Sequence, residues 1–446
     1  MVQILSRYNN HSLKPLEVYP LNVETGNRAC WAIATTHPLM CYHRSLFTCK
    51  GSLASGIVMD ASHIDEKALV ELLKDLIRID SVNPSLVPGA AGEAEIAGFI
   101  SDWMEDLGLE TRLYDVEPGR PNVVGVLKGA GGGRSLILNG HTDTVGVDYY
   151  EGDPFNPVVK DGHLHGRGSI DMKGGLAATM AAVKALIDSG AELKGDVILA
   201  AVCDEEYASI GTEALVKEYT ADAAIVGEPT GGHVLVAHKG FAWVDVVTHG
   251  VAAHGSSFKV GVDAIVKMGK VLIGLEALGQ LLLEETHPLV GPGSVHASII
   301  EGGSELSTYP ASCRLQLERR LIPGENRDTV EKEMKDMLQS IGESDPKFRA
   351  DHRVTFYRDP MEVSPDEPIC RALVEGSAKT LGFKPLFTGG SGWLDTQIMT
   401  EKGVPSVSHG PLGYGAHAKE EWVDLKSVFD VARVQEYAVK AFCGLV

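Results

Sequence analysis

The sequence lacks features that would point to a membrane, a nucleic acid or an oxidising compartment. No run of about 18 apolar residues occurs, so no membrane-spanning helix is expected. Lys and Arg number 40 against 60 Asp and Glu, and the net charge of −20 argues against nucleic acid or an anionic membrane as the main partner. The seven cysteines form no CxxC pair, and their odd number favours free, mostly buried thiols in a reducing cytoplasm.

The first 58 residues are short of acids and of regular patterns. They contain only two acidic residues, Glu17 and Glu24, and no clear helical or strand periodicity. They also lack the charged start and apolar core of a secretory signal, and they are not rich enough in Arg and Ser for a convincing organellar transit peptide. We therefore expect residues 1–58 to be an extra N-terminal segment that is disordered or not native, with Met59 as the native start.

The rest of the chain has the patterning of an α/β enzyme. Hydrophobic residues make up 44% and charged residues 22%, which is typical of a globular protein. Short apolar runs alternate with helix-period stripes, as at 64–79 and 174–187, and this order predicts a mostly parallel sheet with helices on both faces. The pattern changes near Gly240, where a βαββα block begins. The expected organisation is a catalytic domain in two segments, 59–239 and 353–446, with an inserted α+β domain at 240–352.

Three apolar runs end in residue types that bind divalent metals. The runs and their following residues are 135–140 with His141 and Asp143, 197–202 with Glu205 and Glu206, and 223–227 with Glu228. Such runs are typical of buried strands, and ligands of α/β sheets bind outside the carboxyl ends of the strands. The sequence therefore predicts a hydrolytic metal site at one edge of the sheet.

Each candidate residue also has a simpler interpretation. His141 and Asp143 point the same way on an extended chain, so Asp143 could orient a metal-bound His141, although a direct role stays open. Asp171, in a glycine-flanked loop that opens a helix, is either an N-cap or a carboxylate that bridges two metals. The Glu205–Glu206 pair is either a solvated turn or one metal ligand beside one base.

Taken together, five segments resemble the M20 family of metallopeptidases and amidohydrolases, which includes acetylornithine deacetylase and succinyl-diaminopimelate desuccinylase. The segments are LNGHTDTV, HGRGSIDMKGGLAA, DEEYASIGT, VGEPT and GYGAHAKEEWV. They occur in the family's order and spacing, and the resemblance covers about residues 60 to 446. The resemblance implies a zinc-exopeptidase-like fold with an inserted lid and dimerisation domain.

The resemblance also implies roles for the site residues. His141 and Glu228 would hold one Zn²⁺, Glu206 and His417 the other, Asp171 would bridge the two, and Glu205 would be the general base. Co²⁺ or Mn²⁺ could replace zinc in such a site. A cis peptide after Asp171 is implied as well.

In the lid, the resemblance implies a homodimer and two further roles. His254, in HGVAAHGSS, would reach the active site of the partner subunit and stabilise the oxyanion. Arg320, in ERRLIPGE, would grip a substrate carboxylate. Ser307–Pro310 departs from the family pattern, which leaves the contacts to the substrate end open. Residues 393–395 are expected to line the pocket.

The leading hypothesis is a cytoplasmic dinuclear metal hydrolase that cleaves the amide bond of small N-acyl amino acids. A carboxypeptidase or dipeptidase would use the same site on a peptide bond. A binding protein without turnover, or a structural dimer built through the lid, would be expected to have lost a ligand or the base. None of the six metal-site residues is missing from this chain.

Overall fold

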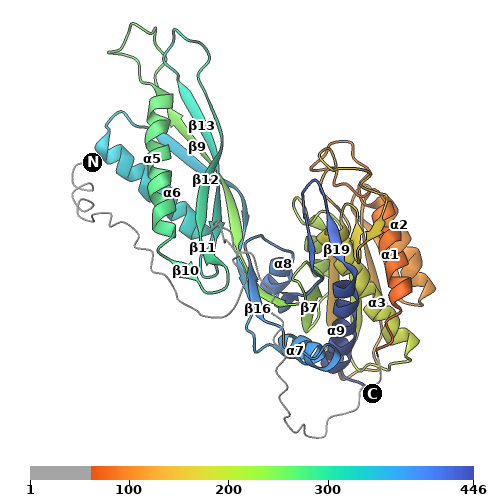
Figure 1. The fold of residues 1–446 in the computed structure, drawn as a ribbon. Coiled ribbons are helices and arrows are strands. Elements are labelled where there is room, and N and C mark those ends of the chain that lie inside the picture. Colours follow the sequence, from red (N-terminus) through yellow and green to blue (C-terminus); the bar gives the residue numbers. More distant parts are fainter. Residues whose placement is uncertain (1–61) are drawn as a thin grey trace, which may run out of the picture. The chain divides into compact units, whose positions relative to one another are not determined.

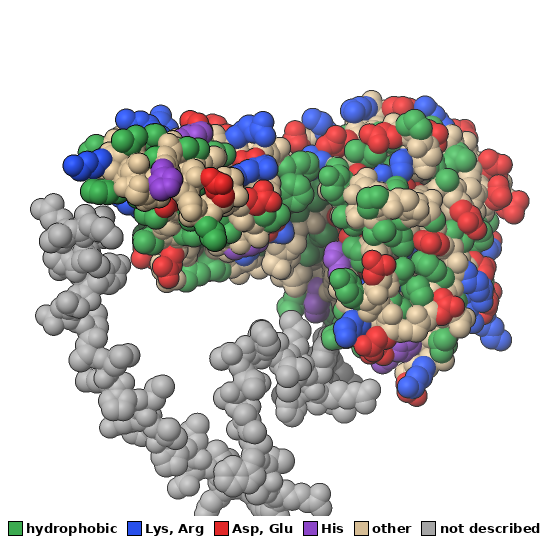
Figure 2. Space-filling model, turned by 90° about the horizontal axis from the view of Figure 1, so that it is seen from above, with side chains coloured by type: hydrophobic (Ala, Val, Ile, Leu, Met, Phe, Trp, Pro, Cys, Tyr) green, Lys and Arg blue, Asp and Glu red, His purple; other side chains and the backbone are tan. Residues whose placement is uncertain are grey.

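The computed structural model describes residues 62–446. The segment predicted to be disordered or not native, residues 1–58, lies outside the described residues. Within the described range, no helix is both long and apolar enough to cross a bilayer. Figure 2 shows acidic and basic side chains interspersed over one face of the molecule, so a charge of one sign does not dominate that face.

A large mixed sheet with a parallel centre carries the site. Its nine strands are, in spatial order, β1 (Glu110–Glu117), β2 (Arg120–Leu127), β6 (Val197–Val202), β3 (Leu136–His141), β7 (Ala223–Val226), β17 (Ser406–Ser408), β8 (Val234–His238) and β15 (Met361–Glu362), with β16 (Phe387–Gly390) also paired to β8. The neighbouring strands β6, β3, β7 and β17 are parallel. β2 and β8 flank them in antiparallel pairing. The parallel centre explains the continuous apolar runs, because both faces of these strands are buried.

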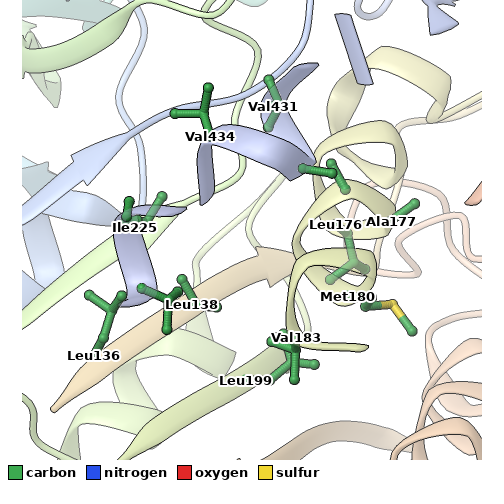
Figure 3. Packing of buried hydrophobic residues seen from close by; sticks show 14 of the residues in the cluster. Leu136, Leu138, Leu176, Ala177, Met180, Val183, Leu199, Ile225, Val431 and Val434 are labelled. Carbon is green, nitrogen blue, oxygen red and sulfur yellow. The ribbon is translucent and has the colours of Figure 1, made fainter. Parts of the chain in front are cut away.

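Helices cover both faces of this sheet, as the sequence predicts. One face packs against α1 (Glu66–Arg78), α2 (Ala94–Asp106), α3 (Gly174–Asp188), α7 (Pro368–Thr380) and α9 (Leu425–Cys443), and the other against α4 (Ile210–Glu218) and α8 (Thr396–Glu401). Figure 3 shows Val183 of α3 beside Leu199 of β6 in the first core. The adjacent residue of β6, Ile198, joins the second core, because successive side chains on a strand point to opposite faces. The ends of the central strands are thereby held from both sides.

The inserted segment forms a second sheet with its own core. Its four strands are, in spatial order, β12 (Ser294–Gly302), β13 (Ser312–Leu321), β9 (Gly240–His249) and β14 (Ala350–Arg358). Helices α5 (Ala264–Leu282) and α6 (Arg327–Ser344) pack on one face of this sheet (Figure 1). We call this inserted segment the lid. The sequence assigned the strand near Arg353 to the second catalytic segment, but β14 pairs with β9. The lid sheet therefore ends at Arg358 and not before Arg353.

Smaller elements complete the fold. A four-stranded sheet contains β18 (Gly413–Tyr414), β19 (Trp422–Asp424), β5 (His163–His165) and β4 (Val158–Lys160), and a short pair contains β10 (Thr286–His287) and β11 (Gly291–Pro292). Because β19 pairs with β5, the chain around residue 417 lies next to the chain that leads into Asp171. Two candidate ligands distant in sequence are thus brought to one place.

Candidate metal centre

The three strands that end in candidate ligands are direct neighbours. β3 lies between β6 and β7 and is parallel to both, so their carboxyl ends meet at one edge of the sheet. His141 is the last residue of β3, Glu205 and Glu206 follow β6 in the next turn, and Glu228 follows β7. The topology confirms the prediction that these strand ends meet.

The candidate ligands form two groups that share Asp171. In the first group, His141 Nε2 lies 3.3 Å from Asp171 Oδ1 and 3.6 Å from Glu228 Oε1. In the second, His417 Nε2 lies 3.4 Å from Asp171 Oδ2 and 2.9 Å from Glu206 Oε2. The potential ligand atoms of each group lie within 4.8 Å of one another. Asp171 thus offers one oxygen to each group, which is the arrangement that a bridging carboxylate requires.

The chemistry of these groups fits a pair of divalent cations. Imidazole and carboxylate are ligands that zinc accepts readily. Glu206 Oε1 and Glu228 Oε1 are buried, and neither has a hydrogen-bond partner among the described residues. A buried polar atom without a partner is costly, and one cation in each group would satisfy these oxygens.

The raised pKa values of the candidate ligands also indicate that the site requires positive charge. Burial and the charge of Asp171 raise the pKa of Glu206 to about 7, and burial raises the pKa of Glu228 well above its usual range. Hydrogen bonds to Asp171 and Glu206 raise the pKa of His417 to about 10. Carboxylates crowded away from water keep protons unless a cation replaces them.

Glu205 lies half-buried in the cleft next to both groups. Desolvation and the charge of Glu228 raise the pKa of the Glu205 carboxyl well above its usual range. No ring nitrogen or cationic side chain lies within ion-pair distance of this carboxylate among residues 62–446, in contrast to Glu206. Glu205 is therefore available to accept and return a proton.

Asp143 acts on the Glu205–Glu206 turn more directly than on His141. Its carboxylate oxygens accept the backbone N–H groups of Glu205 at 3.1 Å and of Glu206 at 3.2 Å. His141 Nδ1 lies 2.9 Å from the backbone carbonyl oxygen of Asp143 and 3.6 Å from its carboxylate. The carbonyl therefore fixes the His141 tautomer that leaves Nε2 free for a metal, a role that the sequence interpretation gave to the carboxylate.

A buried polar network behind the turn supports Asp143. Asn83 Nδ2 donates to Asp143 Oδ2 at 2.8 Å and to Asp204 Oδ1 at 3.0 Å. Arg120 Nη2 also donates to Asp204 Oδ1, at 2.8 Å, and its guanidinium forms a two-pronged ion pair with Glu93. Asp204 has a positive φ of 68°, which is uncommon for a residue with a side chain, and these bonds hold it there.

A second clamp joins the loop of Asp171 to the loop of His417. The Glu421 carboxylate accepts the backbone N–H groups of Gly168 at 3.0 Å, Ile170 at 3.0 Å and Asp171 at 3.2 Å. Arg167 Nη1 donates to Glu421 at 2.7 Å, and Arg167 Nη2 donates to the carbonyl of Ala418 at 2.9 Å. Glu421 is fully buried. The peptide bond after Asp171 is cis, as the resemblance implies.

The metal groups open into a cleft of about 460 Å³ that also contacts the lid. Arg320 lines this cleft, together with Trp393 and Leu394 of the predicted segment 393–395. Asp395 does not line it and instead accepts a hydrogen bond from Thr212 Oγ1 at 2.6 Å. His254 is exposed on the lid, with Nδ1 2.9 Å from Ser256 Oγ, and it does not line the cleft. A catalytic role for His254 would therefore require a second subunit.

Sequence reasoning missed the residues that hold the site together. Arg167 and Glu421 stand inside two of the quoted segments, HGRGSIDMKGGLAA and GYGAHAKEEWV, but nothing in those segments singles them out as clamp residues. Neither Asn83 nor Arg120 is singled out by the sequence. Arg120 begins the apolar strand β2, but nothing near it in sequence indicates its role, because its partners Glu93 and Asp204 are distant in sequence.

Comparisons with known proteins agree with this geometry. The model of peptidase family M20/M25/M40 matches residues 137–441. The chain is 30% identical to an N-formyl-4-amino-5-aminomethyl-2-methylpyrimidine deformylase of Bacillus subtilis, over 85% of this chain and 95% of that protein. It is also 30% identical to an acetylornithine deacetylase of Myxococcus xanthus, over 84% of this chain and 98% of that one.

The fold is also found in solved structures. A tripeptidase from Staphylococcus aureus superimposes with a TM-score of 0.72 and 22% identity, over 85% of this chain and 99% of that chain. At this level of identity the likeness establishes the fold, including the α/β architecture predicted from the sequence.

Proposed function

The protein belongs to peptidase family M20/M25/M40, and from this premise we propose that it is a dinuclear zinc hydrolase that cleaves the amide bond of small N-acyl amino compounds. N-acyl amino acids are the class that the sequence motifs imply. The observation that carries the proposal is the pair of ligand groups that share Asp171 beside Glu205. Co²⁺ or Mn²⁺ could take the place of zinc with the same ligands.

Each candidate ligand has a defined role in this proposal. His141 and Glu228 would hold one cation, Glu206 and His417 the other, and Asp171 would bridge them. When bound, two such cations lower the pKa of a shared water and polarise the carbonyl of the scissile amide.

Glu205 would be the group that transfers the proton. It lines the same cleft as both ligand groups, and no cationic side chain lies within ion-pair distance of its carboxylate among residues 62–446, so it could accept a proton from the attacking water. Glu205 would take a proton from the attacking water and pass it to the nitrogen of the leaving amine, so that the C–N bond breaks to a neutral amine and a carboxylic acid. The acid then releases its remaining proton to solvent and leaves as a carboxylate. Asp143 would keep Glu205 and Glu206 in place through their backbone N–H groups.

Two relatives support deacylation over peptide hydrolysis. By their names, one removes a formyl group from an aminomethylpyrimidine and the other an acetyl group from ornithine, and each is matched over most of its length. Both remove a small acyl group from an amine. A carboxypeptidase or dipeptidase remains the alternative outcome of the experiment that follows.

The test is hydrolysis by zinc-loaded protein of a panel of acyl compounds and dipeptides. The panel contains N-acetylornithine, N-succinyl-diaminopimelate, N-acetylmethionine, an N-formyl aminomethylpyrimidine and several dipeptides. We expect turnover of at least one acyl compound, and a loss of about 10²–10⁴-fold in kcat for Glu205→Gln with zinc content unchanged. Glu117→Gln, which changes an exposed glutamate of the edge strand β1 that does not line the cleft, is the matched control.

Turnover of dipeptides alone would mean that the protein is a peptidase and not a deacylase. No turnover of any compound, with two zinc ions bound per chain, would contradict the hydrolase proposal and favour a binding protein on the same fold.

We also propose a homodimer formed through the lid. β12 is an edge strand of the lid sheet with exposed Ile299 and Ile300, and α5 exposes Val266 and Ile273. An apolar edge strand beside an apolar helix face is suited to pairing with a second copy. The partner copy would then be the one to receive His254. Sedimentation of the protein and of Ile273→Asp tests this, and a wild-type monomer at micromolar concentration would contradict it.

A cytoplasmic location completes the proposal. Cys203, Cys313, Cys370 and Cys443 are buried free thiols, which is typical of a reducing compartment. Fractionation of the native host, with the protein detected by antibody, would test the location.

A further inference from the structure

The open face of the lid sheet carries two rows of three side chains, and all of them except Phe356 line the cleft. In one row, Phe241 of β9 stands between Arg320 of β13 and Arg358 of β14. In the next row, Trp243 stands between Glu318 and Phe356. The rows are two residues apart on each strand, so all six side chains lie on the same face of the sheet. Helices α5 and α6 pack with residues of the opposite face.

The charges in these rows are already balanced within the chain. Arg320 Nε donates to Glu318 Oε1 at 2.6 Å, and Arg358 Nη1 lies 2.7 Å from Glu213 Oε1. Two arginines therefore face two glutamates, and the cleft carries no net positive charge on this wall. A substrate carboxylate would have to compete with Glu318 for Arg320, the residue that the sequence assigned to carboxylate binding.

The arginines and the glutamate also fix the aromatic rings. The Arg320 guanidinium lies 5.1 Å from the centre of the Phe241 ring, and that of Arg358 lies 5.3 Å from the centre of the Trp393 ring. Trp243 Nε1 donates to Glu318 Oε2 at 3.1 Å, which leaves the faces of its indole as the part of the side chain available to a ligand. Because these three charged side chains contact the rings and are paired with acids or donors of the protein, they orient the rings more than they attract a charged ligand.

The aromatic side chains form one wall of the cleft. Phe241, Trp243 and Trp393 all line it, and the ring centre of Phe241 lies 5.7 Å from that of Trp243 and 6.4 Å from that of Trp393. Trp243 is 39% exposed, which is high for a tryptophan whose neighbours are packed. Offset or edge-to-face contacts at such spacings favour a further ring over an aliphatic chain.

We propose that the amine half of the substrate carries a planar aromatic or heteroaromatic ring, which stacks on Trp243 and is enclosed by Phe241 and Trp393. The inference rests on the proposed hydrolase function and narrows its substrate class. Glu205, Asp171 and His417 line the same cleft, so a ring on this wall leaves the amide within the metal groups. An aliphatic diamino acid would place its charged amine and carboxylate against neutralised arginines and aromatic faces.

The test compares substrates that share one acyl group. N-acetylbenzylamine has a ring and no carboxylate, and N-acetylphenylalanine has both. N-acetylornithine has an aliphatic side chain without a ring. We expect kcat/KM to be higher for both ring compounds than for N-acetylornithine. We expect Trp243→Ala to lower the ratio of kcat/KM for the ring compounds to kcat/KM for N-acetylornithine by about 10-fold, because roughly one aromatic pair is lost. Trp243→Phe should restore most of this ratio. Tyr149→Ala, which removes an exposed aromatic outside the cleft, should leave the ratio unchanged.

A preference for N-acetylornithine, or an equal loss on all three compounds in Trp243→Ala, would overturn the inference. Measurements of ligand binding distinguish failure of this inference from failure of the hydrolase proposal. If zinc-loaded protein hydrolyses nothing, calorimetric titration with benzylamine and with ornithine still tests the ring: tighter binding of benzylamine that weakens in Trp243→Ala would support it. Equal or weaker binding of benzylamine would refute it.

Discussion

The two groups of candidate ligands differ in how the fold holds them. His141 and Glu228 stand at the ends of adjacent parallel strands and are almost fully buried. His417 stands in a loop with a positive φ of 60°, and its side chain is 57% exposed. The hydrogen-bond ladder of the sheet fixes His141 directly, whereas His417 has no strand to fix it.

The second group depends on side chains that bind backbone N–H groups. Asp143 holds the turn that carries Glu206, and Glu421 with Arg167 joins the Asp171 loop to the chain beside His417. Both carboxylates are fully buried, so their hydrogen bonds are stronger than they would be in water. Ligands carried by loops therefore need buried acceptors that hold their backbone, whereas His141, at the end of a strand, is held by the sheet.

The largest expected effect comes from the residue that the two groups share. Asp171→Ala removes one oxygen ligand from each group, so we expect the zinc content to fall from two ions per chain to fewer than one. Activity should fall by about 10³-fold or more, because electrostatic stabilisation of several kcal/mol is lost. Elemental analysis after gel filtration measures the first effect and hydrolysis rates the second. Two tightly bound zinc ions in this variant would show that Asp171 is not the bridge.

The difference between the two groups also explains what could be predicted from the sequence. β3, β6 and β7 are buried on both faces, so their apolar runs and the ligands at their ends can be recognised in the sequence. β1 was missed, because an exposed edge strand such as Glu110–Glu117 has almost no apolar pattern. The lid end was placed too early for a similar reason, since the short alternation of β14 does not reveal which sheet it joins.

The supporting residues could not be predicted in the same way. Glu421 acts through three backbone N–H groups about 250 residues away in sequence, and any residue type except proline supplies such a group. His417 was identified only from the family pattern, and its exposed loop has no periodicity of its own.

The next largest effect should follow from loosening the loop clamp. Glu421→Gln keeps the size of the side chain but loses its charge and places an amide N–H₂ among the N–H donors of Gly168, Ile170 and Asp171. We expect the affinity for the weaker of the two zinc ions to fall by about 10–100-fold, as with other groups that orient ligands, and the affinity for the tighter ion to fall less. Competition titration with a chelator resolves the two affinities.

The neighbouring Glu420 supplies the matched control for the clamp. It is exposed, and its side chain forms no hydrogen bond with another described residue, so Glu420→Gln should leave both zinc affinities unchanged. Equal weakening of both ions in Glu421→Gln would mean that the two groups are held as one unit, which would end the distinction between them.

The smallest expected effect concerns the turn that serves both metal binding and proton transfer. Asp143→Asn retains one acceptor oxygen but presents an N–H₂ group to donors from Asn83, Glu205 and Glu206, so one buried donor loses its acceptor. With zinc saturating, we expect kcat to fall by about 10-fold while KM changes little, because Glu205 is displaced but the aromatic wall is not. The exposed Asp148→Asn is the control. A loss confined to KM would indicate that Asp143 supports substrate binding and not the position of the base.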